Sequence, residues 1–166
     1  MRLPPTIAVA ALLPLLLTAC GKDATSGADG PCGPIQREAL DRQFLVHVLG
    51  DAEVQYTSDP PTSGPHQPTP AVDGVQAEAI PRAVQVGILE AGDVLLQHRP
   101  DLPADQLARL EALARDGVVV APNPDLDIPV VATAWLYKRS CSSVDATALE
   151  EFVHDRLGKG PGSDAP

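Results

Sequence analysis

The 166-residue chain is poor in basic residues. It has 12 lysines and arginines against 22 aspartates and glutamates, which gives a formal net charge of -10. The acidic residues are dispersed along the sequence. This charge argues against binding to nucleic acid and against electrostatic adhesion to anionic lipid, so we interpret it as a solubility feature.

The sequence also lacks the short motifs of several enzyme classes. It has no C-x-x-C pair, no G-x-S-x-G elbow, no phosphate-cradling glycine loop and no dinucleotide fingerprint. These absences leave thiol redox catalysis and nucleotide binding without support. A hydrolase is a remote alternative that depends on Ser63 lying near His66.

The amino-terminal apolar run is too short to cross a membrane as a helix. It extends from Ile7 to Leu17, contains Pro14 and follows a positive charge at Arg2. A spanning helix needs roughly 20 apolar residues. The pattern is typical of a cleaved secretory signal, which we place at residues 1–19.

The segment Leu17-Thr18-Ala19-Cys20 resembles the bacterial lipobox. That resemblance implies cleavage before Cys20 and acylation of its thiol, with palmitate-type chains that each contribute about 0.8 kcal/mol per buried methylene. The alternative is a plain signal peptide with a chance cysteine. We therefore expect an extracytoplasmic protein whose lipid anchor holds it on a bacterial membrane.

Cysteine is scarce, and only Cys32 and Cys141 remain when Cys20 is assigned to lipid. Outside the cytoplasm we expect these two to form a disulfide, although two free thiols or a metal pair are alternatives. The predicted organisation is a lipidated flexible tether over 20–31, a single domain over 32–157 and a disordered tail over 158–166.

The second half of the domain has clear periodic patterns. They predict α+β architecture, with a mainly antiparallel sheet and two helices packed on it. The expected order is a strand at Gly92–His98, a helix at Ala104–Asp116, strands at Val118–Ala121 and Pro129–Tyr137, and a helix at Asp145–Leu157. Apolar residues on both faces of the strand at Pro129–Tyr137 indicate a central strand covered on both sides.

The first half is harder to interpret. Leu45–Val48 and Val54–Tyr56 are candidate edge strands, whereas a helix is an equal possibility for Arg37–Leu45. Two of the four histidines, His98 and His154, are interpreted as surface residues.

The segment YTSDPPTSGPH, Tyr56 to His66, is stiff before any tertiary contact forms. Prolines fix φ near -65° and restrict the residues that precede them, whereas Gly64 permits positive φ. The imidazole of His66 is therefore held with little freedom. Such a histidine serves either as a structural clasp that bonds a carbonyl or as a ligand, and we favour the clasp.

Together with LEAG at Leu89–Gly92, VVVAP at Val118–Pro122 and PVVATAW at Pro129–Trp135, the PPTSGPH motif resembles a bacterial family of secreted or membrane-anchored domains of unknown function. The resemblance implies two further histidines in a V-H-x-L-E-H-G motif that would form a metal or acid/base cluster with His66. This chain has Gly87 and Ala91 at those positions.

Loss of both histidines favours a non-catalytic binding or interaction module at the cell envelope. Its partner would be an unknown envelope protein or a small ligand, at a candidate site formed by His66, Tyr56, Glu90 and Trp135. We expect no cofactor in that case. The alternative is a zinc or copper protein in which His66, His47 and Glu90 bind the metal.

Overall fold

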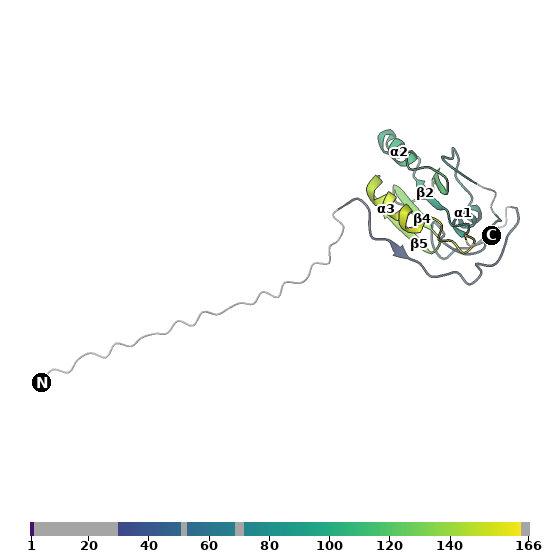
Figure 1. Cartoon of the computed structure of the whole chain (residues 1–166), viewed down its shortest axis with the longest axis horizontal. Coiled ribbons are helices and arrows are strands. Elements are labelled where there is room, and N and C mark those ends of the chain that lie inside the picture. Colours follow the sequence, from purple (N-terminus) through teal and green to yellow (C-terminus); the bar gives the residue numbers. More distant parts are fainter. Residues whose placement is uncertain (2–29, 51–52, 69–71, 164–166) are drawn as a thin grey trace.

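The computed structural model of the chain describes residue 1 and residues 30–50, 53–68 and 72–163 (Figure 1). Residues 2–19 of the predicted signal peptide, Cys20 and nearly all of the tether lie outside the described residues. Among the residues that are described, no helix is long and apolar enough to cross a membrane.

A five-stranded sheet forms the centre of the domain, with strand order β1-β5-β4-β2-β3. The strands are β1 (Gln36–Arg37), β2 (Val94–His98), β3 (Val118–Pro122), β4 (Val130–Ala134) and β5 (Tyr137–Cys141). The β2–β3 pair is parallel and the other three pairs are antiparallel. The α+β prediction is confirmed, but the sheet is mixed, because a helical crossover connects β2 to β3 and such a connection allows parallel pairing.

Three helices pack on the sheet, where two were predicted. They are α1 (Arg82–Glu90), α2 (Ala104–Glu111) and α3 (Ala146–Arg156). Predicted helices correspond to α2 and α3, and Asp145 caps α3 by accepting a hydrogen bond from the Ala148 amide. Helix α1 was missed because its β-branched residues favour a strand and its N-cap, Pro81, provides no capping side chain.

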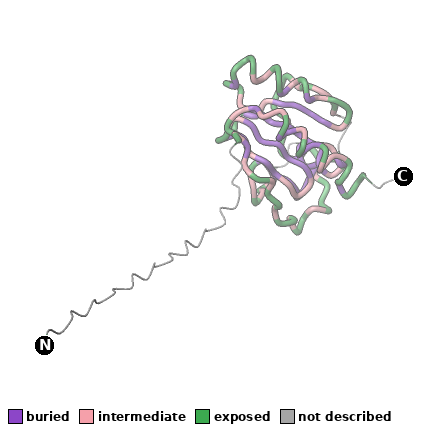
Figure 2. Tube along the Cα trace, turned by 60° about the vertical axis from the view of Figure 1, so that its left-hand side comes forward, coloured by how far each residue is buried: buried purple, intermediate pink, exposed green. Residues whose placement is uncertain are grey.

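The helices cover opposite faces of the sheet (Figure 1). One apolar cluster joins β2, β3 and β4 to residues of α2 and α3, including Leu110, Leu149 and Phe152. A smaller cluster joins Ile88 and Leu89 of α1 to the other face. The strands consequently form the buried middle layer (Figure 2), and β4 is buried on both faces as predicted.

The single strand predicted at Pro129–Tyr137 is wrong, because the chain reverses within it. Ala134 pairs with Tyr137 across a two-residue turn that joins β4 to β5. Leu136 adopts a φ of 63° in this turn, where glycine or asparagine is usual. Backbone hydrogen bonds from Leu136 N to Thr62 O and from Glu38 N to Leu136 O hold this conformation.

The first half of the domain forms little regular structure. Neither the edge strands expected at Leu45–Val48 and Val54–Tyr56 nor the alternative helix at Arg37–Leu45 is present. His47 instead makes an isolated parallel bridge to His66. Arg37 belongs to β1 and pairs with Tyr137 of β5, whereas His47 pairs with the proline-rich segment. Residue patterns alone could not place these segments.

Covalent and backbone contacts tie both ends of the described domain to the sheet and helices. Cys32 and Cys141 form the expected disulfide, which links the start of the domain to β5. Although residues 158–166 were predicted to be a frayed tail, Gly158 N donates to Gly92 O and Gly162 N donates to Glu90 O. Residues 158–163 therefore lie against the end of α1.

Candidate functional site

The proline-rich segment is buried from Pro60 to His66 and is held by hydrogen bonds at both ends. Tyr56 Oη donates to Pro65 O at 2.7 Å, and Thr62 Oγ1 donates to Glu38 Oε2 at 2.6 Å. Gly64 has a φ of 128°, and a Cβ there would lie 3.1 Å from the Tyr56 ring. Glycine is therefore required for both the backbone conformation and the close approach of this ring.

A partly buried ion pair supports the same segment. Lys138 Nζ on β5 lies 2.8 Å from Glu38 Oε1, while Ser58 and Thr62 donate to Glu38 Oε2. Burial acts to raise the pKa of Glu38, but the hydrogen bonds from Lys138, Thr62 and Ser58 outweigh it and hold the pKa below its usual value. The ionised carboxylate thus connects the loop to the sheet.

His66 is completely buried, and both of its ring nitrogens face oxygen atoms. Nδ1 lies 3.0 Å from the carbonyl oxygen of Gly64, and Nε2 lies 2.6 Å from Glu90 Oε2. Its backbone is fixed as well, since His66 N donates to Val46 O and Val48 N donates to His66 O.

The carbonyl contact decides which nitrogen of His66 carries a proton. A carbonyl oxygen only accepts, so Nδ1 must be the donor and the neutral ring then has a lone pair on Nε2. That lone pair faces a carboxylate oxygen, which repels it. Nε2 and Glu90 Oε2 lie at ion-pair distance, 2.6 Å, without the geometry of an aligned hydrogen bond. A metal ion bound by both atoms at about 2.0–2.2 Å would require them to move apart.

His47 is a third potential ligand beside this pair. Its ring lies edge-on to the ring of His66, with centroids 4.8 Å apart and an interplanar angle of 77°. One ligand atom each from His47, His66 and Glu90 lie within 4.8 Å of one another. His47 is exposed and 28% of the Glu90 side chain is exposed, so the cluster opens to solvent on one side.

Glu90 is the last residue of α1, and the carboxyl-terminal segment holds this helix end. Gly162 N donates to Glu90 O at 2.9 Å, which satisfies one of the carbonyls that a helix end leaves free. A Cβ on Gly160 would clash with Glu90 O and with Gly92 N. The sequence analysis did not predict that the carboxyl-terminal segment contacts Glu90. The closely spaced glycines of GKGPG, residues 158–162, are the sequence feature that indicates such a close contact.

The two positions where the resemblance implies histidines also lie on α1. Gly87 is buried three residues before Glu90, and Ala91 is the exposed C-cap that follows it. Residues three apart are neighbours on a helix surface. Histidines at the positions that the resemblance implies would therefore lie at the same end of α1 that provides Glu90.

Other predicted residues lie in different surroundings. Ser63 Oγ accepts a hydrogen bond from Asp41 N at 3.0 Å, and no contact between Ser63 and His66 side chains is found among the described residues. Trp135 is half-buried against Phe44, with ring centroids 6.4 Å apart. The structure therefore gives no support to a Ser63–His66 hydrolase.

The two histidines interpreted as surface residues differ from each other. His98 is buried, with 7% of its surface exposed, and its Nδ1 lies 2.9 Å from Arg99 O. That interpretation of His98 is wrong because the end of β2 is covered on both faces. The side chain of His154 is 89% exposed, as expected.

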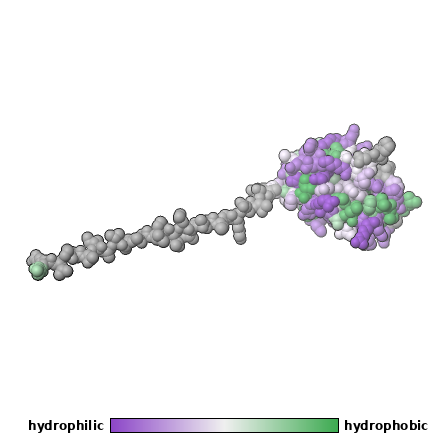
Figure 3. All heavy atoms as spheres, turned by 60° about the horizontal axis from the view of Figure 1, so that its bottom comes forward, coloured by the Kyte–Doolittle hydropathy of each residue, from purple (hydrophilic) through white to green (hydrophobic). Residues whose placement is uncertain are grey.

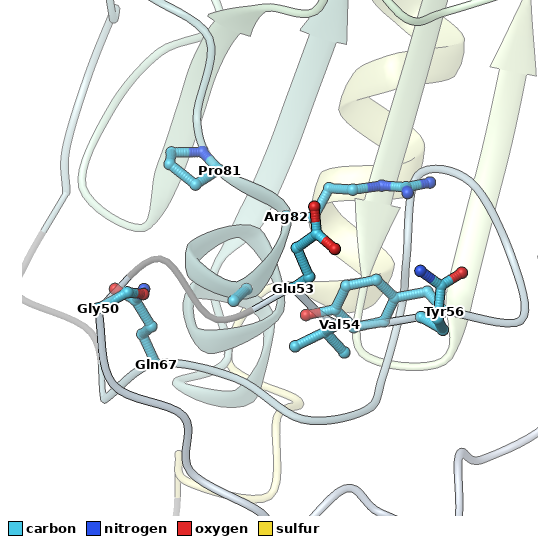
Figure 4. Close-up of a pocket in the computed structure, with 9 residues that line it drawn as sticks. Gly50, Glu53, Val54, Tyr56, Gln67, Pro81 and Arg82 are labelled. Carbon is cyan, nitrogen blue, oxygen red and sulfur yellow. The ribbon is translucent and has the colours of Figure 1, made fainter.

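Tyr56 lines a separate open pocket of about 520 Å³ near the start of α1. In Figure 4, Tyr56, Glu53 and Arg82 lie on one side of this pocket, with Gly50 and Gln67 on the other. Burial, helped by the Asp41 charge and opposed by Arg82, raises the pKa of Tyr56 to about 12. Tyr56 is therefore a neutral hydrogen-bond donor to Pro65, and the structure does not bring it into the histidine cluster.

These features define a small α+β domain with a histidine and carboxylate cluster at the junction of a proline-rich loop and a helix end. Residues 47–166 match the family described as "Protein of unknown function (DUF3105)", and this chain belongs to that family. The chain matches no curated protein and no solved structure.

Proposed function

We propose that this protein is a non-catalytic binding module whose ligand is a divalent transition metal ion. His47, His66 and Glu90 would provide two imidazole nitrogens and a carboxylate oxygen. The proposal takes up the alternative that the sequence analysis ranked second, a zinc or copper protein, in place of the favoured clasp. It is supported by the position of the three residues, whose ligand atoms lie within 4.8 Å of one another.

The observation that carries the proposal is the state of the His66 ring. Its Nδ1 bonds the Gly64 carbonyl, while its buried Nε2 lies 2.6 Å from the Glu90 carboxylate and near the His47 ring. Metal-binding histidines almost always donate their other ring N–H to a carbonyl or carboxylate, which fixes the ring and its tautomer. The Gly64 carbonyl has this role here.

The donor set favours zinc or copper(II). Both metals accept imidazole nitrogen, and zinc sites of two histidines and one glutamate leave a fourth position for water or a partner's ligand. The exposed side of the cluster, formed by His47 and Glu90, provides room for that fourth ligand. Hard cations such as magnesium prefer all-oxygen sites and fit this donor set poorly.

We place this module outside the cytoplasm, with its amino terminus anchored in a bacterial membrane through lipid on Cys20. The signal pattern over residues 1–19 and the lipobox at Leu17–Cys20 support that placement. The Cys32–Cys141 disulfide is consistent with an oxidising compartment.

Metal titration of the purified protein tests the proposal. Calorimetry with zinc and with copper should give one site per chain, and His66→Ala and Glu90→Gln, which each remove a proposed ligand, should each abolish stoichiometric binding. His98→Ala is the matched control, because His98 also bonds a carbonyl through Nδ1 in a buried position. His154→Ala controls for binding to an exposed histidine.

The two interpretations of His66 give different results. A metal site predicts stoichiometric binding that is lost in His66→Ala and retained in His98→Ala, together with a rise in melting temperature on metal addition. A structural clasp predicts no stoichiometric binding and a lower melting temperature for His66→Ala with or without metal. That second result would overturn the proposal.

A further inference from the structure

The loop Leu40–Leu49, hereafter the apolar loop, has several large apolar side chains exposed to solvent. Leu45 is 76% exposed and Leu49 is 82% exposed. Leu40 and Val46 contribute further exposed area in the same loop. Figure 3, which brings the lower side of Figure 1 forward, shows apolar side chains gathered on the surface of the domain. Clustered apolar exposure of this kind marks interaction surfaces.

The apolar loop has a fixed base. Val46 O accepts from His66 N, and Val48 N donates to His66 O on the other side of His47. Phe44 packs against Trp135 of the β4–β5 turn. The loop therefore presents Leu45 and Leu49 from a defined backbone, which lowers the entropic cost of docking.

The tip of the apolar loop carries no charged side chain. Residues 43–50, QFLVHVLG, contain no Asp, Glu, Lys or Arg, although the chain carries a net charge of -10. Asp41 and the exposed Arg42 precede this stretch, and Asp41 accepts a hydrogen bond from Gln43 N. An uncharged apolar tip with an exposed arginine beside it suits the boundary between acyl chains and phosphate headgroups.

The tether sets how far the domain can lie from its anchor. The twelve residues from Gly21 to Cys32 span at most about 43 Å when fully extended. A compact domain of this size has a radius of gyration of about 14 Å, hence a diameter of about 36 Å. The tether is long enough for any face of the domain to reach the bilayer, and it keeps the local concentration of that surface high.

We infer that the apolar loop docks on the same bilayer that holds the acylated Cys20, with Leu45 and Leu49 in the interfacial region. This inference rests on the lipid anchor proposed above and is independent of metal binding. Because His47 lies between these leucines, docking places the open side of the histidine cluster next to the headgroups.

The depth of the loop in the bilayer is the measurement that tests this inference. The full acylated chain is placed in phosphatidylcholine vesicles, with a fluorescent label on Leu45→Cys. Matched controls carry the label on Val75→Cys or Ile128→Cys, which replace other exposed apolar residues, 48% and 39% exposed. Nitroxide lipids should quench the fluorescence of the label at position 45 at least about threefold more strongly than that of the label at either control position. The reason is that the apolar loop enters the interface and the control positions do not.

A second substitution separates docking from misfolding. Leu49→Asp added to Leu45→Cys should reduce quenching by the nitroxide lipids to the level of the controls, while the far-UV circular dichroism and the melting temperature stay unchanged. Equal quenching at all three label positions, on vesicles that float with the protein, would overturn the docking inference and leave the lipid anchor in place. Concentration-dependent protection of the label without vesicles would indicate a second copy on this surface and would also overturn it.

The failure of the anchor gives a different result. Mass spectrometry detects the acyl chains on Cys20, and flotation shows whether the protein remains with the vesicles. A chain with neither acyl mass nor flotation would overturn the anchor and the docking inference together. Metal titration of the same sample reports on the histidine cluster in either case.

Discussion

Residues 82–156 and the described part of residues 30–81 both contribute buried side chains. The first region contains β2 to β5 and helices α1 to α3, whereas the described part of the second contains only the two-residue β1. Apolar periodicity organises the first region. Turns, the Glu38–Lys138 ion pair and hydrogen bonds to the proline-rich segment organise the second. The site lies where the two regions meet, because a stiff loop places His66 and a regular helix places Glu90.

The largest expected effect tests the regular region. Phe152 is completely buried between α3 and the sheet. Phe152→Ala should lower the free energy of unfolding by about 3–5 kcal/mol, because it removes buried apolar area and leaves a cavity. Urea denaturation measures this loss.

Ile128→Ala is the control for Phe152→Ala, since Ile128 is 39% exposed and should cost far less. Metal affinity measured well below the unfolding transition should be unchanged in Phe152→Ala. A large loss of metal affinity in folded Phe152→Ala would show that packing of the regular region also positions the metal ligands.

The second prediction concerns the ion pair of the irregular region. Glu38→Gln should cost about 2 kcal/mol near neutral pH, because it removes charged hydrogen bonds. The pKa of Glu38 is lowered in the folded protein. Its contribution is therefore fully present above the unfolded value near 4.5 and is lost as the pH falls through the folded value.

Unfolding measured from pH 3 to pH 7 checks the sign of this effect. The stability difference between wild type and Glu38→Gln should be largest above about pH 4.5 and should shrink in more acidic solution. A difference that is constant over this range would show that the Glu38 charge does not stabilise the loop. Weaker metal binding in Glu38→Gln would show that the Glu38 contacts, which hold the proline-rich segment, also position His66 for the metal.

A third prediction concerns the carboxyl-terminal support of Glu90. Gly160→Ala places a methyl group against Glu90 O and Gly92 N, so the segment or the helix end must move. We expect roughly tenfold weaker metal binding, comparable to the loss of other supporting contacts around metal ligands. Gly158→Ala is not a suitable control, because Gly158 has a φ of 74°.

Gly30→Ala is a better control for Gly160→Ala, since its new methyl group would make only an ordinary contact, 3.5 Å from Asp145. It should leave metal affinity unchanged. Unchanged affinity in Gly160→Ala as well would mean that the carboxyl-terminal segment does not position Glu90.

The smallest expected effect comes from a surface ion pair within the regular region. Arg115 Nη2 and Glu150 Oε2 lie 2.8 Å apart, and both side chains are more than 40% exposed. A double-mutant cycle should give a coupling energy of about 0.5 kcal/mol that decreases in high salt. A coupling several times larger would show that charge contributes more to the regular region than its apolar pattern indicates.

Sequence alone determined the features that depend on local spacing. Leu149, Phe152 and Val153 recur on one helix face, Asp145 caps that helix, and the apolar run of β4 on both faces indicates a central strand. These patterns are readable because the helical and strand periods are fixed by backbone geometry. The Cys32–Cys141 pair was also predictable, since the expectation of lipid on Cys20 leaves only these two cysteines.

Tertiary structure decided the features that depend on contacts distant in the sequence. The turn at Leu136 is held by Thr62 and Glu38, which no local pattern reveals. Likewise, His47, His66 and Glu90 could be named from the sequence, but only folding brings a loop, a proline-rich segment and a helix end to one point. The physical reason is that hydrogen bonds and ligand geometry require particular distances in space, whereas the sequence fixes only distances along the chain.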